Sequence, residues 1–170
     1  RMVPFAGWEM PVQYPTGPIE EHRITRRSAG LFDIDHMGQI EVTGPEAEAY
    51  LNHVVTRDVS PMQNFDAEYA LLCREDGGVL DDLFIYRLPE RWLVVVNAGN
   101  REKDLAWMQQ HASGYDVNVT DTSDETYMLA LQGPNAITLL NTLTDIDVSE
   151  MARFTAANAI VNEVPAVIGR

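Results

Sequence analysis

Two apolar stretches on either side of Asp76-Gly77-Gly78 constrain this sequence more than any other feature. The first covers residues 67–73 and the second residues 79–86, and both are rich in residues that strands favour. An Asp-Gly or Gly-Gly pair between two such stretches is a strong signal for a β-hairpin with a two-residue turn. We therefore predict a hairpin whose second strand contains an acidic pair, Asp81-Asp82, where Asp is normally disfavoured.

This hairpin also predicts which way each carboxylate of the pair points. Side chains alternate along a strand, and a two-residue turn pairs odd positions of the first strand with even positions of the second. Asp82 then shares a face with apolar and aromatic residues of both strands, namely Tyr69, Leu71, Cys73, Leu80, Phe84 and Tyr86. Asp81 faces the other way, where it can approach Arg74. A three-residue turn would exchange the two faces.

A carboxylate in an apolar, aromatic patch has two chemical uses and one structural alternative. Asp82 can act as a desolvated proton donor or acceptor, or as the counter-charge for a cation that forms beside it. The alternative is a solvated carboxylate at a hairpin edge with no chemical role. The residues of the hairpin alone leave this choice open.

Charge and cysteine content exclude several classes of function. The 170 residues include 12 Lys and Arg against 26 Asp and Glu, a net charge of −14 that argues against a nucleic-acid or anionic-membrane partner. No apolar run is long enough to span a membrane, and no signal peptide is visible. Cys73 is the only cysteine, so no internal disulfide can form, which is typical of a reducing compartment.

The rest of the chain predicts strands and helices in succession. Apolar spacing, with proline or asparagine at several starts, predicts helices over residues 18–29, 44–55, 100–111 and 134–143. Strands are predicted over residues 91–97, 115–120, 127–131 and 160–168, and a strand with a turn over residues 31–42. Residues 3–11, rich in Pro, Gly and aromatics, predict an ordered loop whose bulky side chains plug a core or line a ligand site.

Residues of about 40 to 122 then follow the order β-α-β-β-β-α-β. This is a ferredoxin-like α+β unit with one additional strand, and it predicts mainly antiparallel sheets with helices. Just before it, His36 lies near Asp33 and Asp35, which is interpreted as a structural histidine, a metal corner or an oriented base. No cluster of His, Cys and Glu with ligand spacing supports a metal, so none is predicted.

Five separate stretches, taken together, resemble one protein family. They are Met2-Val-Pro-Phe-Ala-Gly-Trp-Glu-Met-Pro11, Gly30-Leu-Phe-Asp-Ile-Asp-His-Met-Gly38, Gly77-Gly-Val-Leu-Asp-Asp-Leu83, Val95-Val-Asn-Ala98 and Leu131-Gln-Gly-Pro134. In this order and at this spacing they resemble the N-terminal half of the aminomethyltransferase of the glycine cleavage system, the folate-dependent T protein. Asp35 departs from the family, in which a Ser usually precedes the histidine, so the local charge differs there.

The resemblance implies a reaction and its partners. Such enzymes take an aminomethyl group from the lipoyl arm of the H protein and pass the one-carbon unit to tetrahydrofolate. They release ammonia and form 5,10-methylenetetrahydrofolate without using a metal. The family's key aspartate corresponds to Asp82, which would stabilise iminium-like positive charge near the folate nitrogens or carry a proton.

The resemblance also implies binding residues, domains and location. The folate-lining positions that carry over to this chain are Met37, Tyr69, Tyr86, Asn97 and Asn100. Residues 1–40 and 123–170 would be parts of a discontinuous first, folate-binding domain, and residues 41–122 a ferredoxin-like domain inserted in it. The C-terminal half of the family is absent from this sequence. The expected location is cytoplasmic, or the mitochondrial matrix in a eukaryote, with no nucleic-acid or membrane partner.

Other functions stay open at this point. Another folate-dependent one-carbon transferase or demethylase of the same superfamily would share these motifs, since donor choice is set largely outside this chain. A non-catalytic folate-binding relative used in iron–sulfur maintenance would not need the Asp82 surroundings. A purely structural interaction fragment would show no response to folate.

Overall fold

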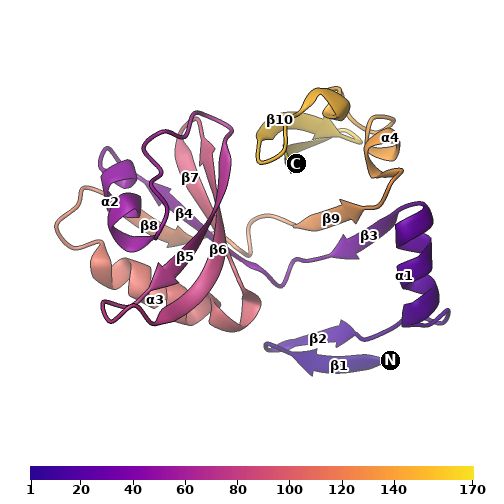
Figure 1. Ribbon diagram of the computed structural model, residues 1–170, viewed down its shortest axis with the longest axis horizontal. Helices are drawn as coiled ribbons and strands as arrows, with labels where there is room; N and C mark the ends of the chain where they lie inside the picture. Colours follow the sequence, from indigo (N-terminus) through magenta and orange to yellow (C-terminus); the bar gives the residue numbers. More distant parts are fainter. The chain divides into compact units, whose positions relative to one another are not determined.

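The predicted β-α-β-β-β-α-β order is present, and its strands form one five-stranded antiparallel sheet (Figure 1). In spatial order the strands are β5 (Ala67–Cys73), β6 (Val79–Leu88), β7 (Arg91–Val96), β4 (Gly38–Thr43) and β8 (Asn118–Asp121). The helices are α2 (Ala47–Val54) and α3 (Arg101–His111), and a short 3₁₀ turn, η1 (Ala98–Asn100), precedes α3. The predicted α+β class with mainly antiparallel sheets is confirmed.

Two groups of segments make up the chain in this computed structural model, which describes all 170 residues. The sheet unit comprises Met37–Tyr127, Ala152–Ala157 and Gly169–Arg170. The segmented unit comprises Arg1–His36, Met128–Met151 and Asn158–Ile168. The domain division implied by the family resemblance stays a prediction.

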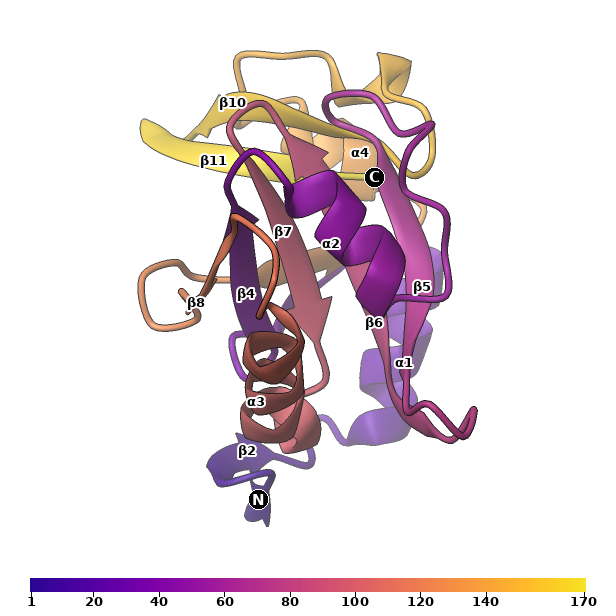
Figure 2. The same cartoon turned by 90° about the vertical axis from the view of Figure 1, so that its left-hand side faces the viewer.

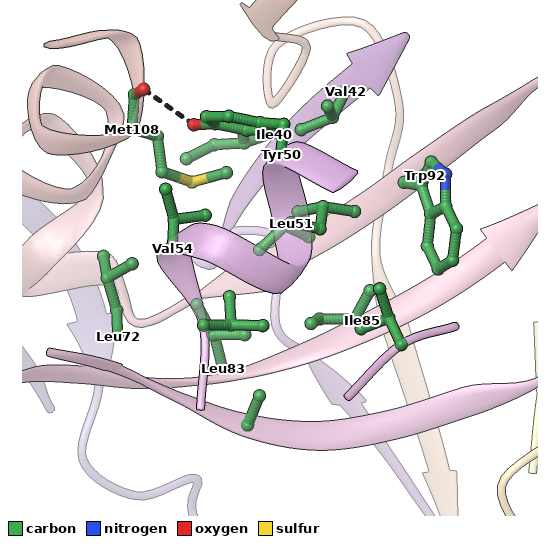
Figure 3. Packing of buried hydrophobic residues seen from close by; sticks show 14 of the residues in the cluster. Ile40, Val42, Tyr50, Leu51, Val54, Leu72, Leu83, Ile85, Trp92 and Met108 are labelled. Carbon is green, nitrogen blue, oxygen red and sulfur yellow. Dashed lines mark hydrogen bonds between the residues drawn. The ribbon is translucent and has the colours of Figure 1, made fainter. Parts of the chain in front are cut away.

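Helices α2 and α3 lie on the same face of the sheet (Figure 2). Strand residues alternate between buried and half-buried, as in β7, so that every second side chain points under these helices. The resulting core contains Ile40, Val42, Tyr50, Leu51, Val54, Leu72, Leu83, Ile85, Trp92 and Met108 (Figure 3). Tyr50 contributes the hydroxyl that donates to the backbone oxygen of Met108 at 2.6 Å, so this buried donor is satisfied.

The hairpin between β5 and β6 is closed by a longer loop than the predicted two-residue turn. The amide of Arg74 donates to the oxygen of Gly78 at 2.8 Å, and that of Gly77 donates back to Arg74 at 2.9 Å. Gly77 has a φ of 83°, in the left-handed region that favours glycine. A β-bulge between Leu72 and Cys73 then shifts the register.

Beyond this bulge, odd positions of β5 still lie opposite even positions of β6. Leu71 pairs with Asp82 and Tyr69 with Phe84, so the prediction that Asp82 shares a face with these residues is confirmed. The prediction was wrong for Leu80, which packs against the helix-covered core because the bulge displaces it. We call the face that carries Tyr69, Asp82, Phe84 and Tyr86 the helix-free face, since α2 and α3 cover the other one.

Other elements lie wholly or partly in the segmented unit. They are β1 (Met2–Phe5), β2 (Trp8–Pro11), α1 (Pro18–Arg27), β3 (Gly30–Asp33), β9 (Leu129–Gln132), α4 (Ala136–Leu140), η2 (Val148–Glu150), β10 (Ala156–Val161) and β11 (Val164–Gly169). The pairs β1-β2, β3-β9 and β10-β11 each form a two-stranded sheet. The structure has no helix both long and apolar enough to cross a membrane.

Two hairpins in these segments contradict the sequence predictions. Residues 3–11 were predicted as a loop but form β1 and β2, which are joined at Ala6-Gly7. Residues 160–168 were predicted as one strand but belong to two strands, β10 and β11, which are joined at Asn162-Glu163. All four turn residues have positive φ, which is the backbone of a type I′ turn. The bulky side chains Phe5 and Trp8 are exposed, so they do not plug a core.

Candidate functional site

Asp82 lies on the helix-free face of β6 between donors from both neighbouring strands. Tyr69 of β5 donates its hydroxyl to Asp82 Oδ2 at 3.0 Å. On the other side Asn97, which directly follows β7, donates its side-chain amide to Asp82 Oδ1 at 3.0 Å. Each carboxylate oxygen therefore has its own donor, and the two bonds fix the orientation of an otherwise exposed side chain.

Aromatic rings continue the site along β6. The ring of Phe84 lies 5.2 Å from that of Tyr86 and stacks on Phe154 at 5.8 Å. Phe154 is held there because its oxygen accepts the amide of Ala67, the first residue of β5, at 2.8 Å. Burial raises the pKa of Tyr86, whose hydroxyl lies so close to Gly169 that an added Cβ would come within 2.9 Å of it. The arrangement is a carboxylate followed by a row of rings.

Asp82 has no counter-ion on the helix-free face. Glu41, the carboxylate of β4 on the same face, lies 2.8 Å from Arg91 Nε, whereas Asp82 makes no ion pair. The hydrogen bond to Asp82 raises the pKa of Tyr69, since the phenolate would lose that bond and face a carboxylate. Asp82 is thus available to meet positive charge that develops on a bound molecule.

Asp81, the next residue back, points to the helix-covered face and is held by amides. The backbone and the side chain of Asn97 both donate to it at 3.0 Å, and Asn100 donates at 2.6 Å. The predicted approach to Arg74 is wrong, because Arg74 belongs to the hairpin loop and pairs there. Burial acts to raise the pKa of Asp81, but the hydrogen bonds with Asp104 and the two asparagines hold it below its usual value.

The side chain of Asn97 links the two carboxylates. Its Nδ2 lies 3.0 Å from Asp81 Oδ1, from Asp82 Oδ1 and from the backbone oxygen of Asp82. An amide nitrogen has two hydrogens, so these acceptors share them. The orientation of the exposed carboxylate is therefore tied to that of the buried one.

The predicted site residues are thus brought together in part. Tyr69, Asp82 and Asn97 are in direct hydrogen-bond contact, and Tyr86 lies farther along β6 on the same face. Met37 is half-buried and immediately precedes β4. The assignment of these residues to catalysis and to folate binding stays a prediction.

Asn100 is placed differently from the other predicted residues. Its side-chain amide donates a hydrogen bond to Asp81, and its Oδ1 accepts a hydrogen bond from the Lys103 ammonium at 2.8 Å. It stands at the N-cap position of α3, as predicted, but makes no side-chain capping bond. Its contacts therefore connect it to the buried carboxylate and not directly to Asp82.

The sequence did not predict that Asp104 lies buried behind this site. Asp104 of α3 is fully buried, and neither of its carboxylate oxygens receives a hydrogen bond. Burial first, and then Asp81, raise the pKa of Asp104 to about 8, while Lys103 acts in the opposite direction. No local signal marks Asp104, because an acidic residue in the first turn of a helix usually faces water.

His36 and its acidic neighbours do not form a metal corner. Asp33 accepts the amide of Asp35 at 3.0 Å, and Asp35 accepts that of Met128 at 3.1 Å, so both carboxylates are used by the backbone. The His36 ring lies edge-on to Phe5 at 5.8 Å. No group of three or more His, Cys, Asp or Glu side chains is arranged to hold a metal ion.

Sequence comparisons cover the whole chain. The family model described as the GCVT N-terminal domain matches residues 1–170. An aminomethyltransferase from Herpetosiphon aurantiacus is 50% identical over 100% of this chain and 47% of its own length. One from Rubrobacter xylanophilus is 46% identical over 100% of this chain and 45% of its own length. The chain therefore spans about half the length of the curated relatives it matches.

Solved structures agree with these matches. Glycine cleavage system aminomethyltransferase T from Bartonella henselae superposes with a TM-score of 0.86 at 38% identity, covering 92% of this chain and 43% of that one. Heterotetrameric sarcosine oxidase from Corynebacterium sp. U-96 shares the fold, with a TM-score of 0.64 at 18% identity over 85% of this chain and 71% of its own. The resemblance found in the sequence is confirmed: this chain belongs to the GCVT N-terminal domain family, that of the glycine cleavage T-type aminomethyltransferases.

Proposed function

We propose that the full-length protein transfers a one-carbon unit to tetrahydrofolate. The donor is an aminomethyl group on the lipoyl arm of the glycine cleavage H protein, and the products are ammonia and 5,10-methylenetetrahydrofolate. Family membership supports this proposal, and one observation carries it. Asp82 stands without a counter-ion beside a row of aromatic rings, oriented by Tyr69 and Asn97.

Asp82 would act on charge during the transfer. The transferred carbon becomes electron-poor when it leaves sulfur and again when ammonia leaves, and a fixed carboxylate stabilises both states. A unit charge about 4 Å away contributes about 4 kcal/mol at an effective dielectric constant of about 20. That energy corresponds to about a thousandfold in rate, so Asp82 is expected to be the most sensitive residue of the site.

The aromatic row would bind the flat ring system of the folate. Phe84 and Tyr86 present half-buried rings next to Asp82, and Phe154 adds a ring stacked on Phe84. Aromatic faces stack well on planar heterocycles, and they exclude water from the carboxylate beside them. Exclusion of water strengthens the attraction between Asp82 and a cation.

Replacement of the Asp82 charge tests the proposal. Asp82→Asn in the full-length protein should lower turnover by at least about a hundredfold and leave the fold intact. Turnover is measured as ammonia released from aminomethyl-lipoyl H protein with tetrahydrofolate, and the fold by circular dichroism. Glu75→Gln, in the exposed loop of the same hairpin, is the matched control and should act like wild type.

Two outcomes would contradict the assignment. Turnover of Asp82→Asn within a few-fold of wild type would remove Asp82 from the chemistry. An inactive wild type with this donor, together with turnover of an N-methylated small molecule, would favour another one-carbon transferase or demethylase of the superfamily.

A further inference from the structure

A carboxyl group that the transfer reaction does not use lies beneath the site. Asp104 belongs to the first turn of α3, and its side chain is directed into the helix-covered core, one turn before Met108. It is 0% exposed, and both of its oxygens lack a hydrogen-bond donor. Buried polar atoms are almost always paired, so this group needs an explanation.

The cation beside Asp104 does not neutralise it. Lys103 Nζ is 3.9 Å from Asp104 Oδ1, beyond hydrogen-bond distance. The same ammonium donates to the backbone oxygen of Leu80 at 2.7 Å and to Asn100 Oδ1 at 2.8 Å. A carboxylate in this position would be buried without donors, which is strongly unfavourable, whereas the neutral acid avoids that cost and gains an O–H group.

An acceptor for that O–H group faces Asp104 from β6. The Asp81 carboxylate lies close enough to accept a hydrogen bond from a protonated Asp104, and it already accepts hydrogen bonds from the backbone and side chain of Asn97 and from Asn100. Two carboxyl groups in contact favour one shared proton. Asp81 has three donors that stabilise its charge and Asp104 has none, so the proton belongs on Asp104. The raised pKa of Asp104 and the lowered pKa of Asp81 agree with this division.

We propose that Asp104 is a neutral, proton-bearing positioning residue, whose O–H donates to Asp81 and thereby fixes Asn97 against Asp82. The titratable groups that face it are Asp81 from β6 and Lys103 from its own helix. The effect on turnover rests on the proposed function of Asp82, but the protonation of Asp104 does not. Asp82 contacts the substrate, and Asp104 influences the orientation of Asp82 through the connected hydrogen bonds of Asp81 and Asn97.

Carbon-13 NMR of the aspartate carboxyl carbons tests the protonation directly. The full-length protein is titrated from about pH 4 to about pH 10, and the Asp104 signal is identified by its loss in Asp104→Asn. The expected midpoint lies several pH units above the ordinary value of about 3.9. An Asp104 signal that is already that of a carboxylate at about pH 5, and does not shift at higher pH, would show an ionised Asp104 and overturn the inference.

Activity separates a positioning role from a merely structural one. Asp104→Asn keeps the size and an N–H donor toward Asp81, whereas Asp104→Leu keeps only the volume. We expect Asp104→Asn to retain at least about ten times the turnover of Asp104→Leu, a difference that corresponds to one charge-assisted hydrogen bond. Glu102→Gln, exposed on the same turn of α3, is the control and should leave turnover unchanged.

The pH profile of turnover adds a readout that does not depend on the Leu variant. Wild-type turnover should fall above about pH 8, where Asp104 ionises beside Asp81. Asp104→Asn cannot ionise, so its alkaline limb should move up by at least about one pH unit. An unmoved limb, or equal turnover of the Asn and Leu variants, would overturn the positioning role. If Asp82→Asn stays active, the proposed function fails while the NMR result stands.

Discussion

Asp81 and Asp82 are neighbours in β6, but they lie on opposite faces of one sheet and in contrasting surroundings. Asp81 is 5% exposed, and the protein supplies its hydrogen-bond donors from two asparagines. Asp82 is exposed, makes no ion pair and is flanked by rings. Because side chains alternate along a strand, one dipeptide can place one carboxylate in the interior, held by amides, and the other at the surface, where we propose that it acts on the substrate.

The two faces of the sheet differ in the same way. Under α2 and α3, side chains such as Ile85 are fully buried in an apolar core, which supplies the free energy of folding. On the helix-free face Phe84 and Leu71 are only half-buried, and the polar groups there point at Asp82. The helix-covered face supplies most of the free energy of folding, and we propose that the helix-free face carries the chemistry. Each prediction below tests that division.

The largest expected effect is a pH dependence of stability caused by Asp104. Its pKa is about 8 in the folded protein and about 3.9 when unfolded, so the folded state binds the proton more tightly. This contribution to stability is therefore fully present below about pH 4 and is lost as the pH rises through about 8, at up to about 1.4 kcal/mol per pH unit. Asp104→Asn should gain stability relative to wild type over this range in urea unfolding.

A parallel pH dependence in wild type and Asp104→Asn would contradict that expectation. Glu102→Gln serves again as the control, because an exposed carboxylate on the same helix should leave the slope unchanged. The comparison isolates one buried proton on the helix-covered face.

Truncation of an apolar side chain should have the second-largest effect, and its cost in stability should differ between the two faces. Ile85→Ala removes a fully buried side chain and should cost about 2–5 kcal/mol, through lost burial and a cavity. Leu71→Ala, on the helix-free face, should cost about 1 kcal/mol because Leu71 is only half-buried. Native-state hydrogen exchange of the β6 and β7 amides measures both. Equal costs would show that the helix-free face is packed as tightly as the other.

Loss of the buried carboxylate should have the third-largest effect. Asp81→Ala leaves the amides of Asn97 and Asn100 without their acceptor and should cost about 2–3 kcal/mol. Combined with Asp104→Leu, which has no donor toward Asp81, the cost should be less than the sum of the single changes, because both remove the same contact. Strict additivity would place the two carboxyl groups in separate networks.

Tyr69→Phe should have the smallest effect on stability. Tyr69 is 52% exposed, so the change should alter the free energy of unfolding by less than about 0.5 kcal/mol. Turnover should fall about threefold to tenfold, since Asp82 loses one of its two donors. Steady-state ammonia release measures the fall, and a stability loss larger than the activity loss would argue against a role specific to the helix-free face.

Local rules predicted much of the sheet unit. Strand alternation placed Asp82 with Tyr69 and Phe84, and helix spacing located α2 and α3 to within a few residues. The predicted two-residue turn was wrong, but the bulge after Leu72 restored the pairing of odd with even positions. The predicted face of Asp82 was therefore still correct. The two missed hairpins depend on pairs of positive-φ residues, which Ala6-Gly7 and Asn162-Glu163 signal only weakly.

By itself, the sequence determined the order of elements in the sheet unit, the face of Asp82 and the family, because these depend on periodicity and on motifs within short stretches. Only the tertiary structure decided that Asp81 meets Asn97, Asn100 and Asp104. Acidic residues in the first turn of a helix usually face water and interact with the helix dipole, so nothing local marks Asp104 as buried. Its environment arises because the first turn of α3 meets β6, where Lys103 donates to the oxygen of Leu80 and Asp104 faces Asp81, residues distant in the chain.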